Sequence, residues 1–155
     1  MTAMPKVDLE PIAPSNATGY PEPFDKEVRG RWWKRIAPLA GLTELGASHV
    51  TLEPGAWSSQ RHWHDGEDEL VIMLSGTAVL VEDEGETEVG PSDILAWAKG
   101  STNGHCLINR SVEPCTFVAI SAGARTGGGY SDIDMIFTDD GRFCRRDGSE
   151  YPKRG

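Results

Sequence analysis

The sequence predicts an all-β protein built as one domain, with the architecture of a β-sandwich or a jelly-roll barrel. Short runs rich in aliphatic and β-branched residues recur roughly every ten residues, and turn-forming residues separate them. The 18 glycines and 10 prolines among 155 residues favour short strands and tight turns over helices. A chain of this length can bury one hydrophobic core but not two.

The first part of the chain precedes the regular strand pattern. Residues 1–23 contain five of the ten prolines, so we expect an extended or irregular arm that lies across the barrel or across a partner subunit. Residues 28–36 alternate aromatic and basic side chains, and a strand here points Trp32 and Trp33 to opposite faces. Stacked aromatics beside arginines also suit a nucleic-acid platform, but the net charge of −9 favours the structural role.

The strands of the barrel follow in order, each bounded by turn residues. Residues 43–53 alternate as in a strand, and Gly46 is a candidate for a bulge. The acidic run 82–86 predicts a solvated hairpin turn, because it lacks the spacing and flanking helices of a calcium loop. From residue 122 the glycine-rich chain is expected to leave the barrel, with an edge strand at 132–137 and a hairpin turn at 139–142. The other strands are expected at 60–64, 69–74, 77–81, 94–98, 105–108 and 116–121.

Three histidines and one glutamate form the strongest chemical signal in the chain. His62 and His64 flank Trp63, so an extended strand points both imidazoles to one face. The four residues after His64 allow a tight turn, which brings Glu69 on a return strand beside the two imidazoles. His105 comes from a later apolar segment and completes an N3O donor set that suits one first-row divalent metal ion.

The same residues carry a resemblance to the cupins over about residues 45–122. The stretch from Gly55 to Gly76 resembles the first cupin motif, which has a glycine, a His-x-His pair, a glutamate and a closing glycine. The resemblance implies a cupin jelly-roll barrel. The second cupin motif is matched by Ser92, Asp93, Gly100, His105 and Asn109, with Ala98 in the place of a proline.

The loop before His105 is two residues longer than in the second cupin motif, which leaves two candidates for the fourth ligand. Counting forward from Gly100 selects Asn103, whereas counting back from Asn109 selects His105. We prefer the second count, because loops absorb insertions and strands do not. The resemblance therefore implies one divalent metal ion, Zn, Mn, Ni or Fe, held by His62, His64, Glu69 and His105.

A narrower resemblance, to a group of small bacterial single-domain cupins, rests on Arg61, Asp68, Asn103 and residues 130–134 and 146–151. Some members of that group carry a sugar-phosphate isomerase label. The resemblance thus implies a metal-dependent isomerase or epimerase that acts on a small polar molecule such as a sugar or a sugar phosphate. An Fe-dependent dioxygenase and a cupin that binds a small ligand without turnover stay open as alternatives. The residues expected beside the ligands are Gln60, Arg61, Met73, Trp97 and Asn103, with Met73 assigned to core packing.

The remaining expectations concern domain organisation, partners and location. We divide the chain into an arm at 1–23, a barrel at 24–122 and a C-terminal extension at 123–155 that packs on the barrel. The acidic charge and the lack of a long apolar run argue against nucleic acid and membranes as partners. The exposed edge strands favour a homodimer that binds a small molecule. Three cysteines without a disulfide pattern (Cys106, Cys115, Cys144) favour free thiols and a cytoplasmic location.

Overall fold

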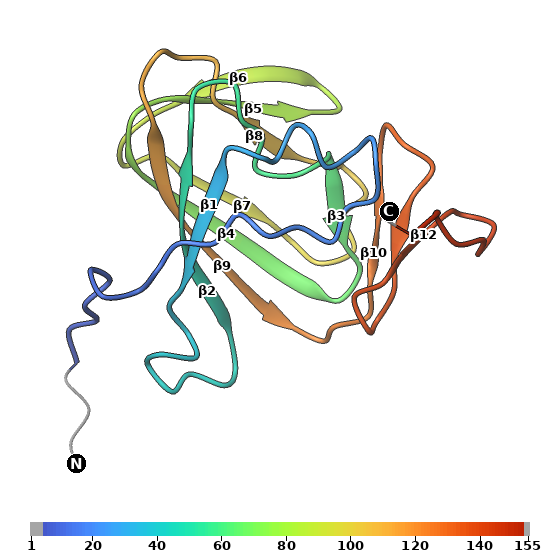
Figure 1. Cartoon of the computed structure of the whole chain (residues 1–155), viewed down its shortest axis with the longest axis horizontal. Coiled ribbons are helices and arrows are strands. Elements are labelled where there is room, and N and C mark those ends of the chain that lie inside the picture. The colour runs from blue at the N-terminus through green and yellow to red at the C-terminus, as the bar shows by residue number, and fades with distance from the viewer. Residues whose placement is uncertain (1–4, 154–155) are drawn as a thin grey trace.

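Figure 1 shows the computed structural model of the chain, in which residues 5–153 are described. Within these residues twelve strands and no helix form the fold, which confirms the all-β class. The largest sheet has five antiparallel strands in the order β1-β2-β9-β4-β7. They are β1 (Arg31–Arg35), β2 (Gly46–Leu52), β4 (Glu67–Ser75), β7 (Ile94–Trp97) and β9 (Cys115–Gly123).

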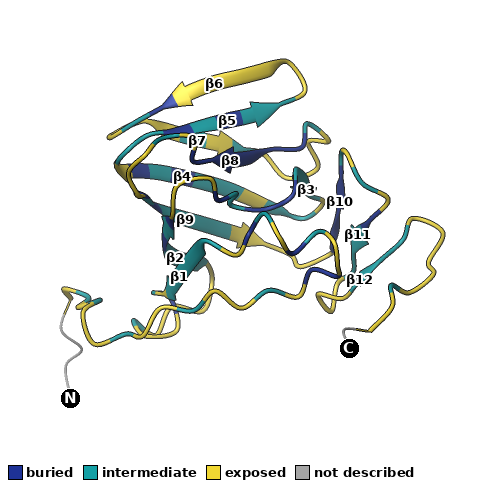
Figure 2. Ribbon diagram, turned by 45° about the horizontal axis from the view of Figure 1, so that its top comes forward, coloured by how far each residue is buried: buried dark blue, intermediate teal, exposed yellow. Residues whose placement is uncertain are grey.

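Two smaller sheets complete the architecture. The three-stranded sheet, in the order β6-β5-β8, contains β5 (Ala78–Glu82), β6 (Gly85–Val89) and β8 (Cys106–Ile108). Figure 2 shows that β6 is largely exposed, and the turn before it is solvated as the acidic sequence predicts. The four-stranded sheet, in the order β12-β11-β10-β3, contains β3 (His62–His64), β10 (Gly128–Tyr130), β11 (Ile136–Phe137) and β12 (Phe143–Cys144).

The main core fills the concave face of the large sheet with alternate strand residues. Val50 on β2 and Met73 on β4 both lie beside Phe117 on β9 in the register of the sheet, and all three are buried. Each such side chain contributes roughly 1.5–3 kcal/mol relative to an exposed one. Met73 is 1% exposed and belongs to this core, so it packs as predicted.

The described part of the N-terminal arm lies along the edge of the barrel. Ser15 and Trp33 exchange two backbone hydrogen bonds, with N to O distances of 3.0 and 2.9 Å. The arm thereby extends past the first strand of the large sheet, and Lys34 Nζ donates to the Leu9 carbonyl at 3.0 Å. Further along, Tyr20 packs with Tyr130 and other C-terminal residues in a second core.

The expectation that the chain leaves the barrel at residue 122 needs a correction. β9 continues to Gly123, and β10 then pairs antiparallel with β3, the strand that carries the first two histidines. The glycines permit this pairing, because an added Cβ on Gly128 would lie 2.0 Å from the Trp63 carbonyl oxygen. The strand expected at 132–137 is shorter, covering only β11, and it is not an edge strand, because it pairs with β10 and with β12. The hairpin turn expected at 139–142 joins β11 to β12.

The predicted hairpin between the two motif strands is also wrong. β3 lies in the four-stranded sheet and β4 in the five-stranded sheet, and the two do not pair. The chain turns a corner between sheets at Gly66, where an added Cβ would lie 2.3 Å from the Ala124 carbonyl oxygen. β4 also begins at Glu67, two residues earlier than predicted, so the alternation of side chains extends to that residue.

Several smaller expectations can be settled here. Gly46 begins β2 and pairs with Ser121 in regular register, so it is not a bulge. All three cysteines are free, with two of them buried. In the described part of the chain, no helix is long and apolar enough to span a membrane. The three-part division of the chain, the homodimer and the cytoplasmic location stay predictions.

Asn109 supplies a test of the fold that is independent of the site. Its buried amide donates to the carbonyls of Leu52 and Glu113 at 2.9 and 2.8 Å. Because Asn109→Ala leaves the Leu52 carbonyl buried without its side-chain donor, we expect the free energy of unfolding to fall by about 2–4 kcal/mol. Denaturant titration measures this loss. Asn16→Ala, which removes one exposed donor, is the control, and equal losses in both variants would contradict the expectation.

Candidate metal centre

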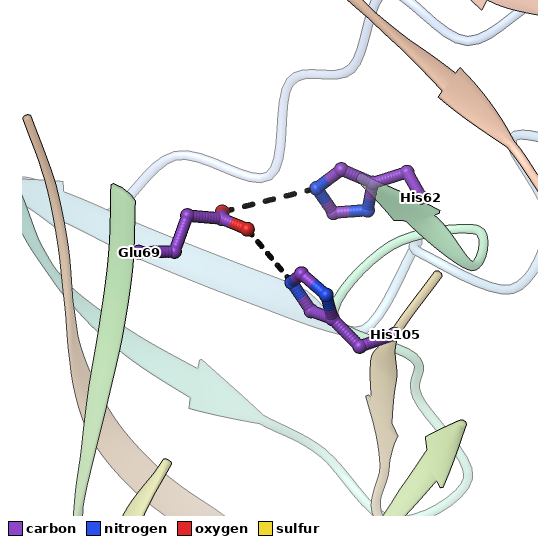
Figure 3. Close-up of side chains that lie close together, drawn as sticks. All are labelled: His62, Glu69 and His105. Carbon is purple, nitrogen blue, oxygen red and sulfur yellow. Dashed lines mark ion pairs between the residues drawn. The ribbon is translucent and has the colours of Figure 1, made fainter. Parts of the chain in front are cut away.

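Three imidazoles approach one carboxylate on the concave side of the large sheet. The Nε2 atoms of His105 and His64 lie 2.8 and 3.0 Å from Glu69 oxygens, and the Nε2 atom of His62 lies at 3.9 Å. Figure 3 shows the rings of His62 and His105 directed at the carboxylate. The donor atoms of His62, Glu69 and His105 all lie within 4.8 Å of one another. His64 is outside this group of three and contacts it through Glu69.

Backbone pairing brings these side chains together from separate parts of the chain. His62 and His105 exchange two backbone hydrogen bonds, of 3.2 and 3.0 Å, which fixes their side chains beside each other. Glu69 lies on β4 opposite Trp97 of β7. The Trp97 indole then stacks on the His105 ring, with centroids 3.7 Å apart and planes 8° from parallel. The stacking holds the His105 ring in one orientation.

The outer nitrogen atoms of two histidines are held by partners away from the cluster. Nδ1 of His62 donates to the Gln60 carbonyl at 3.0 Å, which leaves the Nε2 lone pair facing Glu69. Nδ1 of His64 lies 3.1 Å from a carboxylate oxygen of Glu67. Partners of this kind fix the tautomer and the orientation of a metal-binding histidine.

The charge states follow from burial and from the shared carboxylate. Burial lowers the pKa of His62 to about 4, despite the nearby negative charge of Glu69. Burial also acts to lower the pKa of His64, but contacts with Glu69 and Glu67 outweigh it and raise the pKa. Burial acts to raise the pKa of Glu69, but its contacts with His105 and His64 hold the pKa well below its usual range.

The donor set fits a divalent metal ion. Glu69 Oε2 is buried and makes no aligned hydrogen bond within residues 5–153, although His105 Nε2 is only 2.8 Å away. Neutral imidazoles and one carboxylate are the ligand types that Zn, Mn, Ni and Fe accept in proteins. Imidazole nitrogens and a carboxylate oxygen that face one another in this way can share a cation. The residues that could hold it are His62, His64, Glu69 and His105.

A cavity of about 370 Å³ opens beside the cluster, within the size range of small-molecule sites. Its walls combine apolar side chains such as Val71 and Phe117 with Tyr20 and Arg31. A second cavity of about 410 Å³ adjoins it. The residues that line both cavities are Arg35, Ser48, Glu69, Val71 and Ala119.

Comparisons with known proteins give the family of this chain. The family model described as the cupin domain matches residues 48–121. A crystal structure described as a sugar phosphate isomerase from a cupin superfamily, from Silicibacter pomeroyi, is 38% identical in sequence. That similarity covers 96% of this chain and 97% of that chain, with a TM-score of 0.89. The chain belongs to the cupin superfamily. The jelly-roll barrel implied by the sequence resemblance is thereby confirmed.

Two further solved structures share the cupin fold at lower identity. A candidate sugar phosphate isomerase from Acidithiobacillus ferrooxidans is 20% identical over 81% of this chain and 84% of that chain, with a TM-score of 0.70. The polyketide cyclase RemF from Streptomyces resistomycificus is 18% identical over 84% of this chain and 87% of that chain, with a TM-score of 0.67. Because proteins with such different names share the fold, the fold alone does not identify the reaction.

The cupin site contains some of the residues expected to line it and excludes others. Trp97 lines the cavity of about 370 Å³ beside the cluster, as expected. Asn103 instead donates to Glu82 at 2.6 Å and accepts from the Asp83 backbone at 2.9 Å, at the turn between β5 and β6. Arg61 lies outside both cavities and forms ion pairs with Asp83 and Asp132. The Gln60 side chain is buried and donates to the Phe24 carbonyl at 3.1 Å, away from the cluster, so only the backbone carbonyl of Gln60 contacts His62.

Sequence reasoning missed Glu67 and the arginines of the cavity. Glu67 stands two residues before Glu69 and so shares its face of β4, but the predicted strand began too late to include it. Arg31 and Arg35 alternate with Trp32 and Lys34 on β1, and only their face borders the cavity. The alternation of side chains along a strand could have predicted that Arg31 and Arg35 share one face. Only the order of strands in the sheet shows that this face borders the cavity.

The choice between the two candidates for the fourth ligand can be tested directly. His105→Ala should reduce the metal bound per chain much more than Asn103→Ala, because the Asn103 amide is occupied at the turn between β5 and β6. Elemental analysis of the two purified variants beside the unmodified chain measures this. The opposite ranking would assign the ligand to Asn103.

Glu67 offers a second test, because it contacts the cluster only through His64. Glu67→Gln removes the carboxylate charge beside Nδ1 of His64, and we expect the metal affinity to fall roughly 10–100-fold. Competition with a chromogenic chelator measures the affinity. Glu88→Gln on the exposed strand β6 makes the same change in charge and should leave the affinity unaltered. An unaltered affinity in Glu67→Gln would show that His64 needs no such partner.

Proposed function

We propose that this cupin is a metal-dependent isomerase or epimerase that acts on a small polar molecule such as a sugar or a sugar phosphate. The observation that supports it best is the convergence of three imidazole Nε2 atoms on Glu69 at the wall of a cavity that also contains arginines. A centre of this kind suits polarisation of a substrate oxygen. The relative from Silicibacter pomeroyi, which is described as a sugar phosphate isomerase, adds support.

The proposed metal ion is Zn, Mn, Ni or Fe, held by His62, His64, Glu69 and His105. When bound, it supplies a Lewis acid that stabilises negative charge on a carbonyl or hydroxyl oxygen of the substrate. The protein residues orient that substrate. Val71, Phe117 and Trp97 exclude water from one side of the cavity.

Tyr20 is one of the proton-bearing groups that line the cavity beside the cluster. Its hydroxyl accepts hydrogen bonds from Tyr130 at 3.1 Å and from the Gln60 backbone at 3.3 Å. Burial raises the pKa of Tyr20, so the phenol stays protonated at neutral pH. In the proposed reaction Tyr20 acts as a hydrogen-bonding group that orients a substrate oxygen, and it is not the catalytic base.

The test combines metal analysis with a proton-exchange assay. We expect about one equivalent of metal per chain, and its loss in a His62→Ala, His64→Ala double variant. An isomerase or epimerase should exchange the hydrogen next to a substrate carbonyl with solvent D2O in the absence of oxygen. Nuclear magnetic resonance of a panel of aldose and ketose sugars and their phosphates detects this exchange.

Two other results would replace the proposal. Turnover that consumes oxygen and requires Fe would instead indicate a dioxygenase. A ligand that raises the melting temperature without exchange or turnover would indicate a binding protein. A chain that binds no metal even after reconstitution would remove the basis for either kind of metal-dependent catalysis.

A further inference from the structure

The charges that line the two cavities are unusual for this acidic chain. The net charge is −9, with 24 acidic residues against 15 basic ones. Yet the side chains that line the two cavities include only one carboxylate, Glu69, which belongs to the candidate metal centre. They include three guanidinium groups, those of Arg31, Arg35 and Arg125. The cavities are therefore locally basic.

These three arginines form no ion pair with a carboxylate among the described residues; Arg145 and Arg146 share this property, whereas four other arginines are paired. Arg29, Arg61, Arg110 and Arg142 each form an ion pair with a carboxylate. Across residues 5–153 no carboxylate lies within ion-pair distance of the three cavity arginines. Arg31 donates to two backbone carbonyls, at 2.9 and 3.4 Å, and its Nε has no hydrogen-bond partner among these residues. Three cations without an anionic partner suit an anionic ligand.

Arg35 has the central position among them. It lines both cavities, whereas Arg31 lines only the first and Arg125 only the second. Its guanidinium lies over the Trp33 ring, 5.1 Å from the centroid, which holds the long side chain against the same face of β1. A cation held in place in this way loses less conformational entropy when it binds a ligand.

The register of the sheet places Arg35 across the cavity from the metal centre. Arg35 pairs with Ser48 of β2, Ser48 with Ala119 of β9, and Ala119 with Val71 of β4. Glu69 is two residues from Val71 on the same face of β4. The backbones of Arg35 and Glu69 are thus separated by three strand spacings, about 14 Å across the sheet, and by about 7 Å along β4. A small molecule can contact both ends.

We infer that Arg35, with Arg31 and Arg125 on either side, binds the phosphate group of a phosphate monoester whose other end faces the metal centre. This inference rests on the proposed function, and it narrows the substrate class from small polar molecules to phosphorylated ones. A guanidinium donates two parallel hydrogen bonds to phosphate oxygens. A phosphate monoester carries close to two negative charges at neutral pH, which matches several cations better than a single carboxylate does.

The experiment titrates inorganic phosphate into the full chain by calorimetry, with the metal content of each sample measured separately. We expect binding by the unmodified chain, at least about tenfold weaker binding by Arg35→Ala, and a smaller loss in Arg125→Ala. Arg35→Lys should recover part of the affinity, because it keeps the charge but loses the planar fork. Arg29→Ala removes an exposed arginine outside both cavities and should bind phosphate like the unmodified chain.

Three results would overturn the inference. The first is no detectable binding of millimolar phosphate by the unmodified chain. The second is binding that survives in Arg35→Ala but is lost in the His62→Ala, His64→Ala double variant, because the phosphate would then occupy the metal centre. The third is acetate binding as tightly as phosphate, because the site would then recognise a carboxylate and not specifically a phosphate.

Failure of the proposed function gives a different pattern. If the chain holds no metal or shows no proton exchange while phosphate binding still depends on Arg35, the isomerase proposal is wrong and the anion site remains. If metal and exchange are present but Arg35→Ala binds phosphate normally, the isomerase proposal remains and the phosphate site is wrong.

Discussion

The burial of one negative charge determines how the interior of this barrel is built. The Glu69 side chain is 18% exposed, and an isolated carboxylate in such a position costs several kcal/mol in lost hydration. Three imidazoles, two from β3 and one from His105 just before β8, surround it, and the contacts of His64 and His105 offset that cost. The contacts only form if strands distant in sequence hold a fixed register. The folding of the sheets and the chemistry of the centre therefore depend on the same pairings.

The surroundings of the centre come from the ends of the chain as well as from the part that matches the cupin family model. That match covers residues 48–121. The ring of Phe137 lies 5.1 Å from that of His64, and the ring of Tyr130 lies 5.9 Å from that of His62. Tyr130 in turn packs on Tyr20 of the N-terminal arm. Both terminal segments therefore enclose the histidines and set the polarity around them.

The sequence predicted the local geometry well because alternation along a strand is a local property. The shared face of His62 and His64, the approach of Glu69 and the selection of His105 by its spacing from Asn109 all rest on it. The structure brings His62, Glu69 and His105 together and places His64 against Glu69. Their role as metal ligands stays a prediction.

What the sequence could not predict depends on long-range pairing. Alternation shows that β3 is extended but not which strand lies beside it. The sequence therefore predicted that β3 and β4 form one hairpin, whereas they lie in two different sheets. The pairing of β10 had no side-chain signal, since Gly128 and Gly129 contribute only backbone. The position of Asn103 is decided by its hydrogen bonds to a turn twenty residues away. The residue spacing within the motif cannot predict such contacts.

The pairing of β10 with β3 has a consequence for the order in which the molecule can be assembled during translation. β3 is made early, but the strand that holds its free edge is made some sixty residues later. While the ribosome is still adding the C-terminal residues, His62 and His64 belong to a strand that lacks this neighbour. A nascent chain can thus form much of the large sheet before its histidines are aligned. The alignment of His62 and His64 beside β10 is therefore a late step in the folding of this chain.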